Sequence, residues 1–79
     1  MNAYYATYRT MTQAQKARST LREHGILSSL VRTPKEISEG GCSWALLLNE
    51  WEFPRARPLL TESSRIFRQR GRDWQALAP

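Results

Sequence analysis

The chain has 79 residues, of which 41% are hydrophobic and 24% are charged, and this is enough for a single globular domain spanning residues 1–79. So short a chain leaves little room for the deep cleft of an enzyme, which favours a carrier or a binding protein. The net charge is +5, and the absence of a membrane-length apolar run or a signal-peptide pattern predicts a cytoplasmic protein that does not contact membranes.

The first two predicted elements are a strand and a helix. Residues 4–9 are rich in tyrosine and threonine, which favour a strand. Thr10 and Gln13 have the spacing of a reciprocal capping pair, so we expect a helix from Thr10 to the left-handed cap position at Gly25. An apolar stripe at roughly helical spacing predicts the buried face of this helix: Met11, Ala14, Ala17 and Leu21.

Two more strands are predicted on either side of a loop. Residues 26–33 read as a strand that Pro34 ends, and residues 34–41 read as the loop. Residues 43–49 form the third strand, whose large apolar side chains share one face: Trp44, Leu46 and Leu48. The residues between them are also apolar, which is typical of a strand that is covered on both faces and central in its sheet.

The last third of the chain predicts a helix and a strand. Residues 53–64 form a helical region, in which Pro54 suits the first turn and Pro58 does not suit an interior, so that either the helix starts late or residues 54–57 form a separate turn. Residues 65–70 form a basic strand that Gly71 ends, and we expect Trp74 in the tail to fold back onto the body. The order β-α-β-β-α-β predicts an α+β fold, a ferredoxin-like sandwich with an antiparallel sheet and two helices on one face.

The segment between Thr33 and Cys42 is the most distinctive part of the sequence. Thr33 and Glu36 have the spacing of a second capping pair, and Pro34 suits a first helical position, so we expect one short helical turn. Ile37 would anchor this turn to the core. The segment therefore presents Cys42 at the end of a loop and at the start of the third strand.

Cys42 is the single cysteine, which excludes an internal disulfide and fits a reducing compartment. One cysteine and one histidine do not supply the usual zinc ligands, so we expect no metal site, and no cofactor is indicated. The backbone amides of Gly40 and Gly41 and the side chain of Lys35 would stabilise a thiolate at position 42. Glu36 and Glu39 would oppose that effect, and a lone cysteine is also a common inert core residue.

The layout resembles a small bacterial family of selenium/sulfur carrier protein-like domains, which are themselves functionally uncharacterised. The matching residues cover most of positions 4–70 and are Tyr4-Tyr5, Gly25-Ile26, Thr33-Pro34-Lys35-Glu36-Ile37-Ser38 and Cys42. The sequence departs from the family in having Ser43 for a glycine, Lys35 for an arginine, and one more residue between Pro34 and Cys42. The resemblance implies a non-enzymatic carrier that holds sulfur or selenium on Cys42 as a persulfide or selenosulfide, with donor and acceptor enzymes as partners.

Two alternatives to the carrier stay open. In the first, the cysteine is inert and the domain binds a protein or, as the lesser expectation, a nucleic acid, through the open sheet face or through a basic stretch in residues 65–72. That stretch contains Arg65, Arg68, Arg70 and Arg72. In the second, the domain is a regulatory or structural subunit in which Cys42 senses oxidation. His24 is expected in the last turn of the first helix, where a positively charged side chain interacts favourably with the helix dipole. A catalytic partnership of His24 with Cys42 is the alternative.

Overall fold

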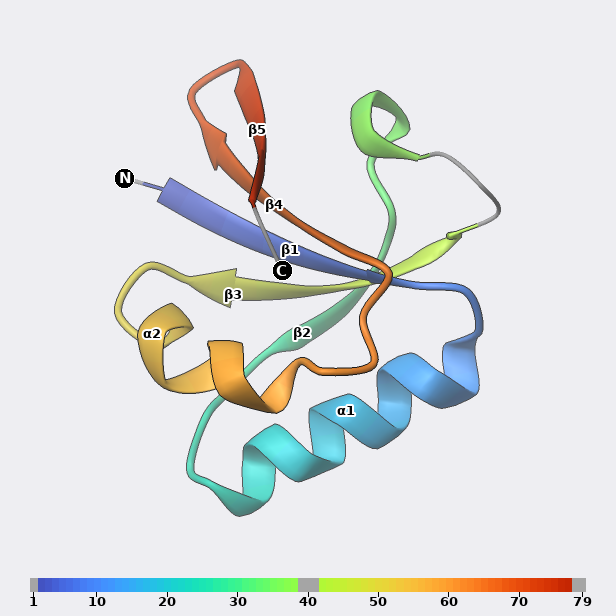
Figure 1. The fold of residues 1–79 in the computed structure, drawn as a ribbon, viewed down its shortest axis with the longest axis vertical. Coiled ribbons are helices and arrows are strands. Elements are labelled where there is room, and N and C mark those ends of the chain that lie inside the picture. Colours follow the sequence, from blue (N-terminus) through green and yellow to red (C-terminus); the bar gives the residue numbers. More distant parts are fainter. Residues whose placement is uncertain (1, 39–41, 78–79) are drawn as a thin grey trace.

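The computed structural model describes residues 2–38 and 42–77, which form an antiparallel sheet with two helices on one of its faces (Figure 1). The elements in chain order are β1 (Asn2–Tyr8), α1 (Met11–Glu23), β2 (Ser29–Arg32), the 3-10 turn η1 (Lys35–Ile37), β3 (Trp44–Asn49), α2 (Phe53–Ala56), the 3-10 turn η2 (Arg57–Leu59), β4 (Arg65–Arg70) and β5 (Asp73–Leu77). Within the described residues, no helix has the length and apolar content needed to cross a bilayer.

The sheet has five strands in the order β2-β3-β1-β4-β5, and every neighbouring pair is antiparallel. The predicted α+β class, with an antiparallel sheet and two helices, is therefore confirmed. The four-stranded ferredoxin-like topology is not confirmed, because the sheet has a fifth strand, β5, at its edge beside β4. The tail does fold back as expected, but it does so as this strand.

The core lies between the helices and one face of the sheet. Strand alternation places Tyr4, Ala6 and Tyr8 of β1 on that face, opposite Leu48, Leu46 and Trp44 of β3. Ala14 and Leu21 of α1 are buried in the same cluster, whereas Met11 at the end of the predicted stripe is 40% exposed. The central position predicted for β3 is confirmed, because it lies between β2 and β1.

Helix α1 begins and ends as the sequence predicts. The Thr10 hydroxyl accepts a hydrogen bond from the Gln13 backbone N–H at 3.1 Å, which is the first half of the expected capping pair. At the other end Gly25 has a φ of +74° and its N–H donates to the Arg22 carbonyl, while the Ile26 N–H donates to the Leu21 carbonyl, each at 2.9 Å. These two bonds form a Schellman motif, which turns the chain toward β2.

Replacing Thr10 by alanine is expected to lower the free energy of unfolding by about 1 kcal/mol, because the Gln13 N–H then loses its side-chain acceptor. Chemical denaturation measures the change. Thr12→Ala is the matched control, since Thr12 lies inside α1 on its exposed side and alanine is the better helix former. Equal losses of stability in both variants would contradict the capping role of Thr10.

The second helical region is shorter than predicted. Helix α2 is a single turn with Pro54 in its first positions, and the chain continues as η2, which contains Pro58. Of the two alternatives from the sequence, the separate early turn is therefore right. A proline cannot donate the backbone hydrogen bond that would extend α2, so the chain tightens into a 3-10 turn at this point.

Candidate functional site around Cys42

Cys42 lies two residues before β3, at the end of the sheet where α1 begins. Trp44, the first residue of β3, pairs with Tyr8 of β1 and with Arg32 of β2. The Thr33 N–H donates to the Ser43 carbonyl at 3.0 Å, which extends the pairing of β2 and β3 to the neighbour of Cys42. The residue that follows Cys42 is thus held by the sheet, so the cysteine has a rigid support on its C-terminal side.

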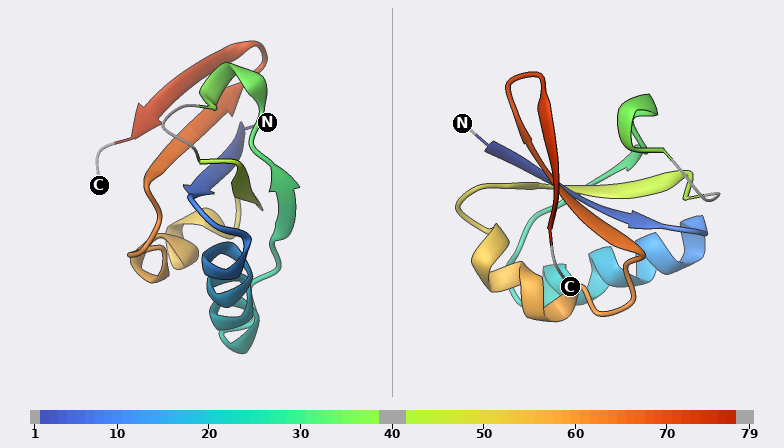
Figure 2. Two further views of the ribbon diagram at one scale, coloured as in Figure 1. Left: turned by 90° about the vertical axis from the view of Figure 1, so that its right-hand side faces the viewer. Right: turned by 45° about the horizontal axis from the view of Figure 1, so that its top comes forward.

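The free thiol of Cys42 is buried, with only 7% of the residue exposed. Among the described residues, four others are buried outside the cluster that packs against the helices: Thr7, Ile37, Ala45 and Phe67. Strand alternation places Thr7, Ala45 and Phe67 together on the second face of the sheet. η1 lies on this same side, away from α1 and α2 (Figures 1 and 2). Cys42 is thus a buried residue outside the main core cluster, and the structure does not show the exposed thiol that a loop cysteine would allow.

The short helical turn predicted after Thr33 exists as η1, but its capping differs from the prediction. Pro34 is the N-cap residue, no side chain caps the turn, and the Ile37 N–H donates to the Pro34 carbonyl at 3.0 Å. The hydroxyl of Thr33 is buried and has no hydrogen-bond partner among the described residues. The predicted pairing of Thr33 with Glu36 is therefore wrong, because backbone hydrogen bonds alone close this short turn. Ile37 is buried as an anchor, as predicted.

The structure describes only part of the predicted thiolate-stabilising group. Lys35 is exposed at the start of η1, and it pairs with no acidic side chain of the described residues. Gly40 and Gly41 lie outside the described residues, as does Glu39. Thr33 was predicted only as a cap, and the sequence did not indicate that its hydroxyl is buried without a hydrogen-bond partner among the described residues. The unsatisfied hydroxyl becomes visible only in three dimensions.

The predicted basic stretch is divided between two faces and a turn. Arg68 and Arg70 alternate with Arg65 and point to the opposite face of β4, while Arg72 lies in the β4–β5 turn. The Arg65 guanidinium stacks over Phe67, at 5.6 Å from the ring centroid, and Arg68 donates to Gln75. The four arginines do not form one contiguous surface, which weakens the interpretation of this stretch as a docking site for an acidic partner.

The second face of the sheet is partly closed by its own aromatic side chains. The rings of Tyr5 and Trp74 lie 5.2 Å apart and are tilted by 55°, and the Tyr5 hydroxyl donates to Gln69 at 3.4 Å. Trp44 is half-buried against the core. Trp51 lies in the turn after β3 and is 72% exposed.

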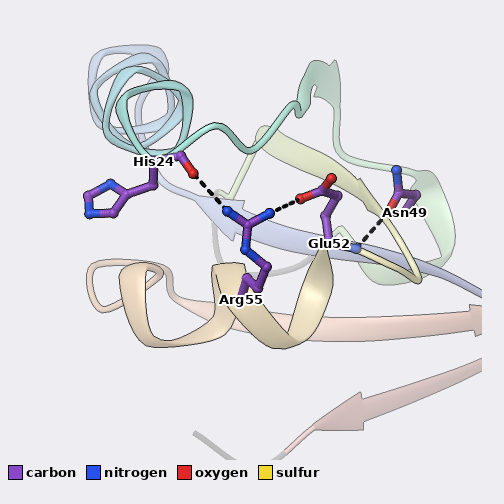
Figure 3. A network of polar contacts seen from close by, with 4 residues as sticks. All are labelled: His24, Asn49, Glu52 and Arg55. Atoms are coloured by element: carbon purple, nitrogen blue, oxygen red, sulfur yellow. Dashed lines mark hydrogen bonds and ion pairs between the residues drawn. The ribbon is translucent and has the colours of Figure 1, made fainter.

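His24 has a structural role at the C-terminal end of α1 (Figure 3). Its Nδ1 donates to the Thr20 carbonyl at 2.9 Å, and its own carbonyl accepts from Arg55 at 2.9 Å. Arg55 also contacts the Glu52 carboxylate at 3.2 Å, and the Glu52 N–H donates to Asn49 at 2.8 Å. This network ties the end of α1 to α2. Cys42 lies at the other end of α1, so a partnership between His24 and the thiol is not formed.

Comparison with protein-family models matches residues 3–68 to the family described as "Putative Se/S carrier protein-like". The matched segment runs from the second residue of β1 to the fourth residue of β4, and Cys42 lies within it. Neither the curated proteins nor the solved structures contain a match to this chain.

Proposed function

Because the chain belongs to the Se/S carrier protein-like family, we propose that it carries sulfur or selenium on Cys42 as a persulfide or selenosulfide. The observation that supports this most directly is the family match, which spans Cys42 in a chain with a single cysteine. A carrier needs one nucleophilic atom and partners that dock beside it. It does not need a cleft with a complete set of catalytic groups, which a domain of this size has little room to hold.

The transfer that we propose conserves atoms and electrons without an added oxidant. The Cys42 thiolate attacks the terminal sulfur of a donor persulfide, and a new sulfur–sulfur bond forms as the donor's bond breaks. The donor sulfur leaves with the electron pair and takes the proton that Cys42 released. Delivery repeats the step with an acceptor thiolate as the nucleophile, which returns Cys42 to its thiol. Selenium would follow the same route from a donor selenosulfide.

Burial of Cys42 gives the carrier a way to retain its cargo. A persulfide is open to attack by any small thiol that reaches it, and 7% exposure of the residue restricts such encounters. Loading then requires a local opening or a docked donor, both of which are common at functional segments of low local stability. The sheet pairing at Ser43 keeps the C-terminal side of Cys42 in place during such an opening.

Two side chains on the segment before β3 are suited to stabilise the anionic sulfur. Lys35 supplies a positive charge from the start of η1, and the unpartnered hydroxyl of Thr33 can donate a hydrogen bond. Thr33→Val keeps the shape of the side chain and removes the donor, and Lys35→Gln removes the charge. Both variants are expected to load sulfur more slowly at neutral pH, without a change in the final extent of loading.

Incubation with a small-molecule persulfide donor, followed by intact-mass measurement, tests the proposal. The wild-type protein is expected to gain the mass of one sulfur atom, and the gain should disappear when the protein is reduced. Cys42→Ser is the matched control, because it keeps the size of the side chain and lacks the nucleophile. A wild-type protein that gains no sulfur, while a control thiol protein does so under the same conditions, would overturn the carrier role.

A further inference from the structure

A second polar site lies between α1 and the segment that leads from η2 to β4. A cavity of about 220 Å³ is lined there by Tyr8, Lys16, Ala17, Thr20, Pro58, Leu59, Thr61 and Glu62. Lys16, Ala17 and Thr20 share one side of α1, and the other wall belongs to η2 and the residues after it. The volume holds a ligand of only a few heavy atoms, since one water molecule takes about 30 Å³ of liquid and drug-sized molecules fill about 300 Å³ or more.

Tyr8 is the buried member of this lining, and its hydroxyl group has no partner. The residue is 0% exposed, and the hydroxyl forms no hydrogen bond to any described residue. A buried polar atom without a partner is costly, and in most proteins it is paired with a side chain, a water molecule or a ligand. Burial, with a smaller contribution from the Glu62 carboxylate, raises the pKa of Tyr8 to about 12, so the hydroxyl remains protonated and able to donate.

Two opposite charges border the same cavity without neutralising each other. Lys16 and Glu62 both line it, and neither forms an ion pair with a described residue. Both residues are exposed, so each charge is solvated and can turn toward a bound molecule. A cavity with one cation, one anion and one buried donor is complementary to a small molecule that carries both charges itself.

We propose that this cavity binds a free amino acid as a zwitterion. Glu62 contacts the ammonium group of the ligand, and Lys16 contacts its carboxylate. The Tyr8 hydroxyl, which is closed to solvent, donates to that carboxylate when the exposed side chains of Lys16 and Glu62 turn toward the ligand. The hydroxyls of Thr20 and Thr61 lie in the same lining and can accept from the ammonium group. Small side chains such as those of alanine and serine fit the volume. The proposal does not depend on the carrier function, because Cys42 is not part of this lining.

Nuclear magnetic resonance titration with L-alanine tests the site, with acetate and methylammonium as single-charge controls at equal ionic strength. L-Alanine is expected to shift the backbone amides of Thr20, Leu59 and Thr61 in a saturable way in the millimolar range. Acetate and methylammonium are expected to give no saturable shift over that range. Equal responses to all three probes, or no saturable response to L-alanine, would overturn the proposal.

Three substitutions assign the contacts. Tyr8→Phe removes only the hydroxyl, and Lys16→Gln and Glu62→Gln each remove one charge at an exposed position. Each is expected to weaken L-alanine binding by about tenfold or more, because a charge-assisted hydrogen bond is lost.

Arg22→Gln and Glu23→Gln are matched controls on exposed residues outside the lining, and they should bind as the wild type does. Cys42→Ser should also bind normally, which separates this proposal from the carrier function. Binding that none of the three lining substitutions weakens would contradict the assignment.

The unpartnered hydroxyl also predicts a pH effect on stability. The Tyr8 pKa is raised from 10.0 in the unfolded chain to about 12 in the folded protein, so the stabilisation of the neutral form is complete below pH 10. Above pH 10 the unfolded chain ionises first, and the unfolding equilibrium constant is expected to rise by about tenfold per pH unit toward pH 12, relative to Tyr8→Phe. Urea denaturation of both proteins at several pH values measures the difference. Parallel pH profiles would show that the Tyr8 hydroxyl is not confined as described.

Discussion

Leu46→Ala is expected to lower the free energy of unfolding by about 2–5 kcal/mol. Leu46 is 0% exposed in β3, where it lies opposite Ala6 of β1 and Leu30 of β2. Truncation removes the transfer free energy of the buried methyl groups and leaves a cavity that a strand held on both sides cannot close. Small domains have little stability to spare, so a loss of this size would leave much of the protein unfolded at physiological temperature.

Urea denaturation followed by tryptophan fluorescence measures this loss. Leu27→Ala is the matched control, because the same atoms are removed from a residue that is 76% exposed. We expect the control to change the stability by less than about 0.5 kcal/mol. Similar losses in the two variants would contradict the position of the core between the helices and β3.

Labelling of Cys42 with a thiol reagent is expected to be slower in the native protein than in urea by about hundredfold or more. The residue is 7% exposed, so the reagent reaches the sulfur only when the structure opens locally. An opening free energy of about 3 kcal/mol corresponds to a population of roughly one molecule in a hundred or fewer. The pH dependence of the native rate reports the thiolate that reacts.

A thiol moved by one residue provides the control for the labelling experiment. Ser43 is exposed, so the double variant Cys42→Ser, Ser43→Cys places the only thiol at an accessible position on the same backbone. This variant is expected to react in the native state at nearly the rate seen in urea. Equal native rates for the two positions would show that Cys42 is accessible and that burial does not protect its cargo.

Local sequence signals predicted most of the elements. Thr10 and Gly25 bound α1 because caps depend on residues that are close in sequence. The residues of β4 were predicted without error, and alternation in β3 identified both the buried face and the central position. The short turn after Pro34 and its buried anchor Ile37 were also predicted, since proline at a first helical position is a local signal.

Features that depend on long-range pairing could not be predicted. Most residues of β5 are exposed, so its sequence lacks the apolar alternation that predicts a strand. β5 pairs with β4 through a turn that Gly71 closes with a φ of +61°. The burial of Cys42 is one such feature, since no local pattern around a loop cysteine indicates whether its side chain is covered. The cavity at Tyr8 joins residues from β1, α1 and η2, and none of these three segments carries a motif that indicates it.

Delivery of sulfur from Cys42 tests the central claim most directly. Protein loaded with a persulfide donor and freed of excess donor is mixed with an acceptor thiol protein, and the intact masses of both are followed with time. The carrier function predicts that the loaded protein loses one sulfur atom while the acceptor gains one, and that Cys42→Ser transfers none. A persulfide that forms on Cys42 but never leaves it, or sulfur that reaches the acceptor equally well without Cys42, would contradict the account.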